Sequence, residues 1–327
     1  MNYRYALMAY DVFSSTITTG NLGDYVQSIA AKQFLPQVDD FISREKLNLY
    51  KGDPVKMIMN GWYMEKALNF PPSPQITPLY VSMHINHLIR KVFFTQNTIN
   101  HLKEHAPIGC RDIGTMSMLK SKGIDSYYSG CLTLTLGKTY KRDNPNDNIY
   151  VIDPFFNMLT CRELLKQPLR LGKRLATGRL KEYNWRKKLL EKHFDDELLS
   201  DACYTTQSIN KISTEDGLTK ADEYLKMLCN AKLVITSRIH CALPCLAMGT
   251  PVIFLNGGFY SPVDHCRFDG ILDFFNRIDV NGKTGKSNPN FSIEGKIGVN
   301  FKITNPDRHK QYAESLLQTC NNFTKVK

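Results

Sequence analysis

Residues 233–255 read LVITSRIHCALPCLAMGTPVIFL and predict a strand, a helix and a second strand in succession. Two apolar runs of strand length, 233–236 and 252–255, flank a stretch of helical length. Pro244 has no N–H and is best tolerated in the first turn of a helix, so we expect the helix to start near Cys241. Such a unit is typical of an α/β protein with a parallel sheet.

Two polar side chains lie where the first strand passes into the helix. Arg238 and His240 follow the carboxyl end of the strand, at the edge where ligands of open parallel sheets bind. An arginine beside a helix N-terminus suits a phosphate or a carboxylate. Alone, the arginine would fit a surface ion pair and the histidine a hydrogen-bonded core position. Together, at this junction, they predict an anion-binding site.

The alternation of strands and helices continues on both sides of this unit. Asp24, which follows the turn-like segment 20–23, is expected to cap a helix, and Arg111-Asp112 opens another. The polar stretch 141–148 has the composition of a linker. We therefore predict two domains, residues 1–145 and residues 146–327. Strands are expected at 5–10, 55–59, 79–83, 127–131, 149–153, near Tyr204, 233–236 and 252–255.

Length, charge and cysteine usage narrow the class of protein. A chain of 327 residues, 42% of them hydrophobic, can bury two ordinary cores. The nine cysteines are scattered without a C-x-x-C pair, which is typical of reduced thiols. The first seven residues lack the apolar region of a signal peptide, and no apolar run is long enough to span a membrane. These features predict a cytoplasmic protein.

The formal charge of +11 is concentrated in one segment. Residues 162–192 hold eleven Lys and Arg against three Glu, a net of +8, with leucines between the charges. This basic segment would suit contact with anionic lipid at the inner face of a membrane. An ordinary solvated pair of helices explains the same pattern equally well, and both interpretations stay open.

Four motifs follow one another along the chain: Gly20-Asn21-Leu22-Gly23-Asp24, Arg111-Asp112, Ser129-Gly130-Cys131-Leu132-Thr133, and Arg238-x-His240-x-Ala242 followed by Gly249-Thr250-Pro251-Val252-Ile253. In this order they resemble the polysaccharide pyruvyl transferases. The resemblance covers residues 3 to about 275. One departure is Asn60-Gly61-Trp62, where members often carry paired glycines, so the approach of a ligand to the backbone there stays open.

The resemblance implies two Rossmann-like domains that face one another across a cleft, as in GT-B glycosyltransferases. It implies transfer of a pyruvyl group from phosphoenolpyruvate to two hydroxyls of a sugar, which gives a cyclic ketal and free phosphate. By motif position, Arg238 and Arg111 would bind the donor, and His240 would be the acid/base. Asn21, Gly23, Asp24 and Ser129 would contact substrate.

The resemblance also implies the partners of the reaction. The acceptor would belong to a capsule or exopolysaccharide, or to its lipid-linked oligosaccharide precursor. Neither a metal nor a cofactor is expected, since phosphoenolpyruvate is itself the donor substrate. The acceptor sugar, its hydroxyl pair, the ketal stereochemistry and the oligomeric state have no signal in the sequence.

Two other functions compete with this one. The same fold would serve a glycosyltransferase that uses a nucleotide sugar, although no Asp-x-Asp pair is present to hold one through a divalent ion. A non-enzymatic binder of nucleic acid or of an anionic surface, built on residues 162–192, is the third interpretation. No known nucleic-acid-binding signature accompanies that segment, so no nucleic-acid partner is expected.

Overall fold

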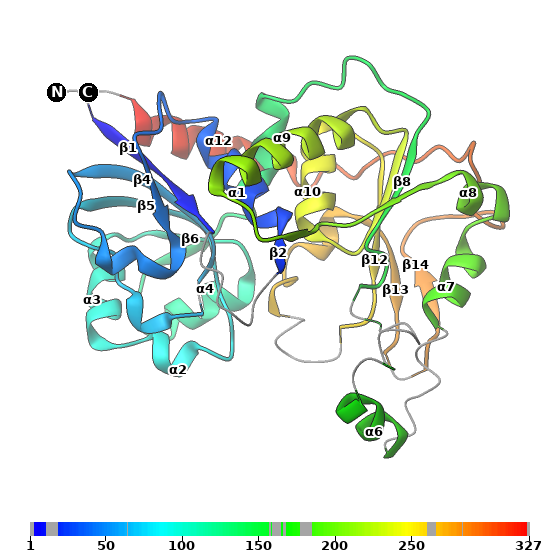
Figure 1. Ribbon diagram of the computed structural model, residues 1–327, viewed down its shortest axis with the longest axis horizontal. Helices are drawn as coiled ribbons and strands as arrows, with labels where there is room; N and C mark the ends of the chain where they lie inside the picture. The colour runs from blue at the N-terminus through cyan, green and yellow to red at the C-terminus, as the bar shows by residue number, and fades with distance from the viewer. Residues whose placement is uncertain are drawn as a thin grey trace.

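The computed structural model describes residues 3–10, 19–63, 65–156, 158, 165, 168–176, 185–259, 266–282 and 284–325. Within them the protein is a mixed α/β structure, built on two six-stranded sheets with helices around them. One sheet comes from the first half of the chain and the other from the second (Figure 1). The predicted α/β class is confirmed.

The first sheet is parallel throughout, with the strand order β3-β1-β4-β5-β6-β7. Parallel strands bring their carboxyl ends to one edge, and this edge carries the polar residues described below. The strands predicted from apolar runs at 5–10, 55–59 and 79–83 are confirmed. The bounds are β1 (Arg4–Ala9), β3 (Asp40–Ser43), β4 (Val55–Tyr63), β5 (Ile76–Ile85), β6 (Ile108–Cys110) and β7 (Ser126–Tyr128).

The second sheet has the order β14-β13-β12-β11-β8-β9, and only the edge strand β14 runs antiparallel to its neighbour. Its central strands are nearly continuous runs of Val, Ile and Leu, as expected for strands covered on both faces. The bounds are β8 (Ile149–Ile152), β9 (Cys203–Thr205), β11 (Leu233–Thr236), β12 (Val252–Asn256), β13 (Asn276–Val280) and β14 (Ser287–Pro289).

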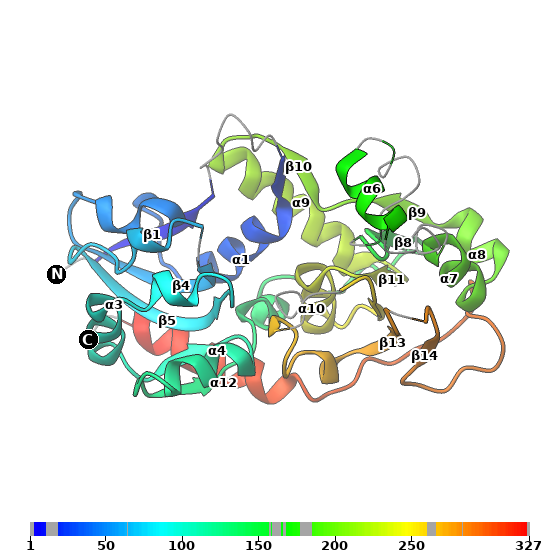
Figure 2. The same ribbon diagram turned by 90° about the horizontal axis from the view of Figure 1, so that it is seen from below.

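Helices between the sheets join the two halves of the molecule. Helices α1 (Leu22–Lys32), α9 (Thr214–Asn230) and α10 (Ile239–Met248), with the 3-10 segment η3 (Leu132–Lys138), pack into one apolar cluster that includes residues of both sheets. Figure 2 shows α1 and α10 between the sheets from a second side. A short antiparallel pair, β2 (Thr19–Asn21) and β10 (Ser208–Asn210), also crosses between the halves.

The remaining helices cover the outer faces. Helix α12 (Lys310–Thr324) returns to the first sheet, where Tyr5 donates a hydrogen bond to the Thr324 carbonyl oxygen at 3.3 Å. The predicted domain boundary at residue 145 stays a prediction. The other segments are η1 (Arg44–Leu49), η2 (Ala67–Asn69), α2 (Arg90–Phe93), α3 (Gln96–Glu104), α4 (Ile113–Lys120), α6 (Pro168–Ala176), α7 (Trp185–His193), α8 (Asp196–Asp201) and η5 (Leu272–Phe274).

Two local expectations about helix starts are wrong. The cap of α1 is Asn21, whose side-chain oxygen accepts from the Gly23 N–H at 3.1 Å, and Asp24 lies in the first turn. Helix α10 begins at Ile239 rather than near Cys241, so Pro244 lies in its second turn. There the proline cannot donate to the carbonyl of His240, and packing of the apolar helix between the sheets compensates for the loss.

The basic segment 162–192 lies partly outside the described residues. Its described parts include α6, which projects away from both sheets (Figures 1 and 2), and most of α7. Leu169 on α6 is 91% exposed. Among the described residues, no helix has the length and apolar character needed to cross a membrane.

Candidate functional site

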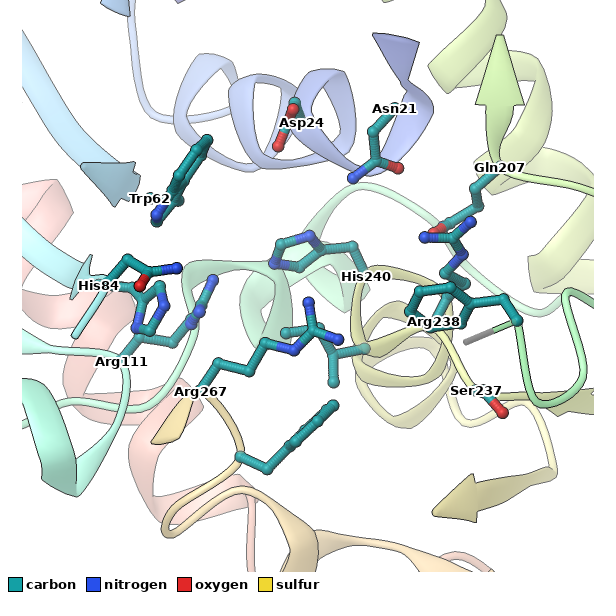
Figure 3. A pocket seen from close by; sticks show the side chains of 14 residues that line it. Asn21, Asp24, Trp62, His84, Arg111, Gln207, Ser237, Arg238, His240 and Arg267 are labelled. Atoms are coloured by element: carbon teal, nitrogen blue, oxygen red, sulfur yellow. The ribbon is translucent and has the colours of Figure 1, made fainter. Parts of the chain in front are cut away.

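A pocket of about 340 Å³ lies where the carboxyl ends of strands from both sheets meet. We call it the central pocket (Figure 3). Helices α1 and α10 direct their N-termini toward it, so backbone N–H groups and two helix dipoles favour negative charge inside. It is lined by Asn21, Asp24, Trp62, His84, Asn86, Arg111, Phe156, Gln207, Ser237, Arg238, Ile239, His240, Arg267 and Phe268.

Arg238 reaches the pocket from the junction between β11 and α10, and two contacts fix its side chain. Its Nε donates to the Asp153 carboxylate at 2.8 Å, and its guanidinium carbon lies 3.7 Å from the centre of the Phe156 ring. Asp153 follows β8 with a φ of 45°, a left-handed conformation that costs on the order of 1–3 kcal/mol in a non-glycine residue. Strain here, where the carboxylate positions an arginine, is consistent with a functional site.

Arg111 reaches the pocket from the other sheet, directly after β6. Its side chain is almost fully buried, and its Nε has no hydrogen-bond partner among the described residues. The next residue, Asp112, caps α4 through the Thr115 N–H at 2.8 Å and lies 2.6 Å from His84 Nδ1. Burial and the nearby Arg111 lower the pKa of His84 to about 4, so His84 is neutral and donates to Asp112.

His240 occupies the middle of the pocket, between Asp24 and Arg267 in Figure 3. Burial lowers its pKa well below the ordinary value, and the guanidinium groups of Arg111, Arg267 and Arg238 lower it further. The unliganded protein therefore holds a neutral imidazole at neutral pH. Its Nε2 is buried without a hydrogen-bond partner among the described residues. It can accept a proton, and a bound anion that offsets the arginines would favour the charged form.

The structure brings together five of the seven residues predicted from sequence, all of which line the central pocket: Asn21, Asp24, Arg111, Arg238 and His240. Gly23 supports them, because a Cβ at this position would come within 2.9 Å of His240 Cβ. Ser129 is not part of the lining. Its hydroxyl accepts from the Ser82 N–H at 3.0 Å and donates to the Cys110 carbonyl, which ties β5 to β6.

Nine lining residues were not predicted from sequence, among them Arg267, His84, Trp62 and Gln207. His84 lies within an apolar strand, and its partner Asp112 is 28 residues away in the chain. Gln207 lies in the segment between β9 and β10. Trp62, at the carboxyl end of β4, belongs to Asn60-Gly61-Trp62, the segment in which the sequence departs from the paired glycines of the resembling family. Arg267 had no sequence signal.

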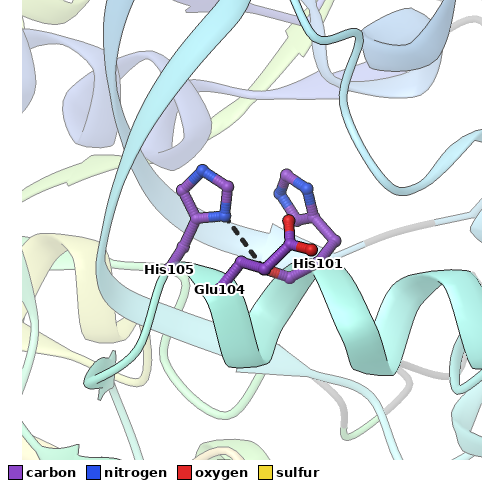
Figure 4. Close-up of side chains that lie close together, drawn as sticks. All are labelled: His101, Glu104 and His105. Atoms are coloured by element: carbon purple, nitrogen blue, oxygen red, sulfur yellow. Dashed lines mark hydrogen bonds between the residues drawn. The ribbon is translucent and has the colours of Figure 1, made fainter.

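One group of side chains within the described part of the chain could hold a metal ion. His101 and Glu104 on α3 and His105 at its C-cap place their possible ligand atoms within 4.8 Å of one another (Figure 4). His101 Nε2 is already hydrogen-bonded to the Tyr80 hydroxyl at 2.8 Å, and His105 Nδ1 to the His101 carbonyl at 2.9 Å. None of the three lines the central pocket, and these bonds explain the cluster structurally.

The lining of the central pocket is predominantly cationic. Three guanidinium groups and two neutral histidines face one carboxylate, Asp24, and the two helix N-termini add to the positive field. The fold and the site thus define an α/β protein with a positively charged pocket, suited to an anion, between two predominantly parallel sheets.

Comparison with known proteins gives this class a family. The model of the polysaccharide pyruvyl transferase family matches residues 21–258. The matched range includes both helix N-termini of the central pocket and the arginines Arg111 and Arg238. The chain therefore belongs to the polysaccharide pyruvyl transferase family. No curated protein and no solved structure gives a significant match.

Proposed function

We propose that this protein transfers a pyruvyl group from phosphoenolpyruvate to two hydroxyls of one sugar, forming a cyclic ketal and releasing phosphate. The observation that carries the proposal is the convergence of Arg111, Arg238 and Arg267 around the neutral imidazole of His240. Phosphoenolpyruvate carries a carboxylate and a phosphate on the same carbon atom. Planar guanidinium forks bind both through paired hydrogen bonds.

The residue types match the steps of ketal formation. The donor's methylene carbon must gain a proton, a hydroxyl must become a better nucleophile, and the departing phosphate must be stabilised. His240 is assigned the first step, because the negative charge of bound donor opposes the arginine field and favours its protonation. The arginines are assigned the third.

The architecture supports a two-domain, GT-B-like arrangement of this enzyme. Each half of the chain supplies one parallel sheet, and both sheets present strand carboxyl ends to the same pocket. Arg111 comes from one sheet and Arg238 from the other, so closure of the halves would complete the donor site.

We also propose that the acceptor is a surface polysaccharide or its lipid-linked precursor, and that the basic segment contacts an anionic membrane from the cytoplasmic side. The projecting helix α6 and the exposed Leu169 support this placement. Sedimentation with anionic but not with neutral vesicles at low salt is the expected result. Equal recovery with both kinds of vesicle would show that the segment is an ordinary solvated surface.

The function itself is tested by two parallel assays on the full chain. Phosphate release from phosphoenolpyruvate in the presence of pyranoside acceptors should be saturable, with a ketal in the product by NMR. Nucleotide release from sugar nucleotides should be absent. Nucleotide release without phosphate release would instead identify a glycosyltransferase.

A further inference from the structure

A second cavity of about 300 Å³ adjoins the central pocket. We call it the side pocket. The two cavities share four lining residues, which form their common border: Asn21, Asp24, Trp62 and Arg238. Beyond this border η1 supplies Arg44 and Glu45, and Glu65 follows β4. The rest of the lining comes from β1 and the residue after it, β2, α1, β3 and β10: Ala9, Tyr10, Gly20, Tyr25, Ser43 and Ser208.

Arg44 is a fixed donor in the side pocket. Its side chain is only 9% exposed, and its guanidinium carbon lies 5.1 Å from the centre of the Tyr10 ring and 4.6 Å from that of Trp62. Its Nε donates to Glu45 at 2.8 Å, and Glu45 is itself held by the Lys66 N–H at 2.7 Å. These contacts prevent the arginine from turning away.

Two N–H donors of this pocket have no hydrogen-bond partner in the described part of the chain. Arg44 Nη1 and Trp62 Nε1 are both buried, and neither has a hydrogen-bond acceptor among the described residues. A buried donor without a partner is costly, so a water, an ion or a ligand with an acceptor atom would stabilise it. The side pocket therefore has the character of a binding site for a molecule that offers acceptor oxygens.

The charges decide which kind of molecule this is. In the side pocket Asp24, Glu45 and Glu65 oppose Arg44 and Arg238, and Arg238 is already neutralised by Asp153. A polyanion is therefore repelled here, although the adjoining central pocket attracts one. Carboxylates that accept and N–H groups that donate are what a neutral polyhydroxyl ligand requires.

Asp24 stands on the border between the two cavities. It lies in the first turn of α1 and accepts a hydrogen bond from Gln27 at 3.3 Å. Burial raises its pKa, and Glu65 and Glu45 add to the effect, while Arg44 and Arg111 oppose it. A carboxylate in this state is a stronger base than one in water, and it faces both a polyanion site and a polyhydroxyl site.

Building on the function proposed above, we infer that the side pocket binds the acceptor as a neutral pyranoside, and that Asp24 takes the proton from its attacking hydroxyl. In the addition step, His240 gives a proton to the donor's methylene carbon, and the electron pair of the carbon–carbon double bond forms the C–H bond. The hydroxyl oxygen bonds to the adjacent carbon, and its proton passes to Asp24.

The displacement step returns His240 and Asp24 to their starting protonation states. The second hydroxyl oxygen bonds to the same carbon, and the bond from that carbon to the phosphate oxygen breaks with its electrons on phosphate. The proton of this hydroxyl passes to His240, and Asp24 gives its proton to the departing phosphate. One hydroxyl proton ends on the new methyl group and the other on phosphate, so the step balances without a further reactant.

Binding can be tested without knowing the natural acceptor. The chain has two tryptophans, Trp62 and Trp185. In a Trp185→Phe variant the tryptophan fluorescence, excited selectively over the tyrosines, reports Trp62 alone, on the border of the two cavities. We expect phosphoenolpyruvate and at least one of a panel of neutral methyl hexopyranosides to perturb it saturably. The pyranoside should still bind when phosphoenolpyruvate is saturating.

Variants then separate the two cavities. Glu65→Gln should weaken the pyranoside about tenfold, the size of one hydrogen bond to a charged group, and leave phosphoenolpyruvate unaffected. Asp40→Asn is the matched control, because Asp40 is a carboxylate of the first half bonded to Arg4 and Tyr50 outside both pockets. It should change neither ligand.

The role of Asp24 is read from turnover with the pyranoside that binds. Asp24→Asn should lower kcat for phosphate release by about 100-fold or more, with binding of phosphoenolpyruvate retained. Three results would each overturn the inference. The protein could respond to phosphoenolpyruvate but to no pyranoside at tens of millimolar, or the two ligands could compete. A pyranoside could also bind to the parent chain without causing phosphate release. Failure to bind phosphoenolpyruvate would instead overturn the proposed function.

Discussion

The central pocket and the side pocket share a wall and differ in the charges that face them. Three arginines and two helix N-termini face one carboxylate, Asp24, in the central pocket, whereas three carboxylates face two arginines in the side pocket. Arg238, paired with Asp153, borders both cavities. Adjacent cavities can therefore favour different partners through the balance of their charges. One suits a polyanion and the other a neutral sugar, and the reacting atoms would meet at their border.

The largest effect is expected at His240, which faces the border from α10. His240→Gln keeps a hydrogen-bonding side chain but cannot relay a proton, so kcat should fall by about 100-fold or more. The KM for phosphoenolpyruvate should change little. Steady-state phosphate release measures both, and His105→Gln, at the C-cap of α3 and outside the lining of both pockets, is the control. A raised donor KM with kcat intact would make His240 a binding group.

The next largest effect should distinguish the pockets through the arginines. Arg111→Lys and Arg238→Lys each keep the charge and lose the planar fork, so each should raise the donor KM about tenfold, the value of one charged hydrogen bond. The effect should be larger for Arg111, whose side chain is 3% exposed against 20% for Arg238. Arg111→Lys should leave the KM for the pyranoside unaffected, because Arg111 lines only the central pocket, whereas Arg238 lines both cavities.

A surface arginine provides the control for Arg111→Lys and Arg238→Lys. Arg4→Lys changes an arginine that is 43% exposed and bonded to Asp40, outside both pockets, and should leave both KM values as they were. If Arg111→Lys weakened the pyranoside and spared the donor, the two cavities would have been assigned the wrong way round.

Local sequence signals were enough for most of the fold. Apolar runs such as 233–236 and 252–255 are strands because they are covered on both faces. Helix starts were harder. Asn21 and Asp24 can both cap a helix, and the structure uses Asn21 because its oxygen reaches the Gly23 N–H. The prediction from Pro244 placed the start of α10 too late, because tertiary packing tolerates a proline in the second turn of this helix.

The site was predictable only where one segment carries its own signal. Arg238 and His240 stand at a strand-to-helix junction, so their shared pocket follows from local structure. Arg267 and Trp62 reach the pocket through tertiary packing, which periodicity does not report. The side pocket depends on Arg44, which is fixed between Tyr10 and Trp62, two rings distant from each other in the chain. No local pattern contains that arrangement.

The smallest expected effect concerns the proton that His240 must gain. In the free protein, burial and the arginine field hold its pKa well below the ordinary value, so the ring is neutral. A bound donor with several negative charges offsets that field and raises the pKa. Since the ring is then more protonated in the complex than in the free protein, binding takes up protons, and donor affinity rises as pH falls.

Calorimetry of phosphoenolpyruvate binding in buffers of different ionisation enthalpy measures this uptake directly. A pH of about 7.5 is suitable, because a phosphate monoester with a second pKa near 6 is already deprotonated and releases little of its own. We expect uptake of a fraction of a proton by the parent chain and distinctly less by His240→Gln. Net release by the parent chain, or equal uptake by both, would show that the arginine field of the central pocket does not control the protonation of His240.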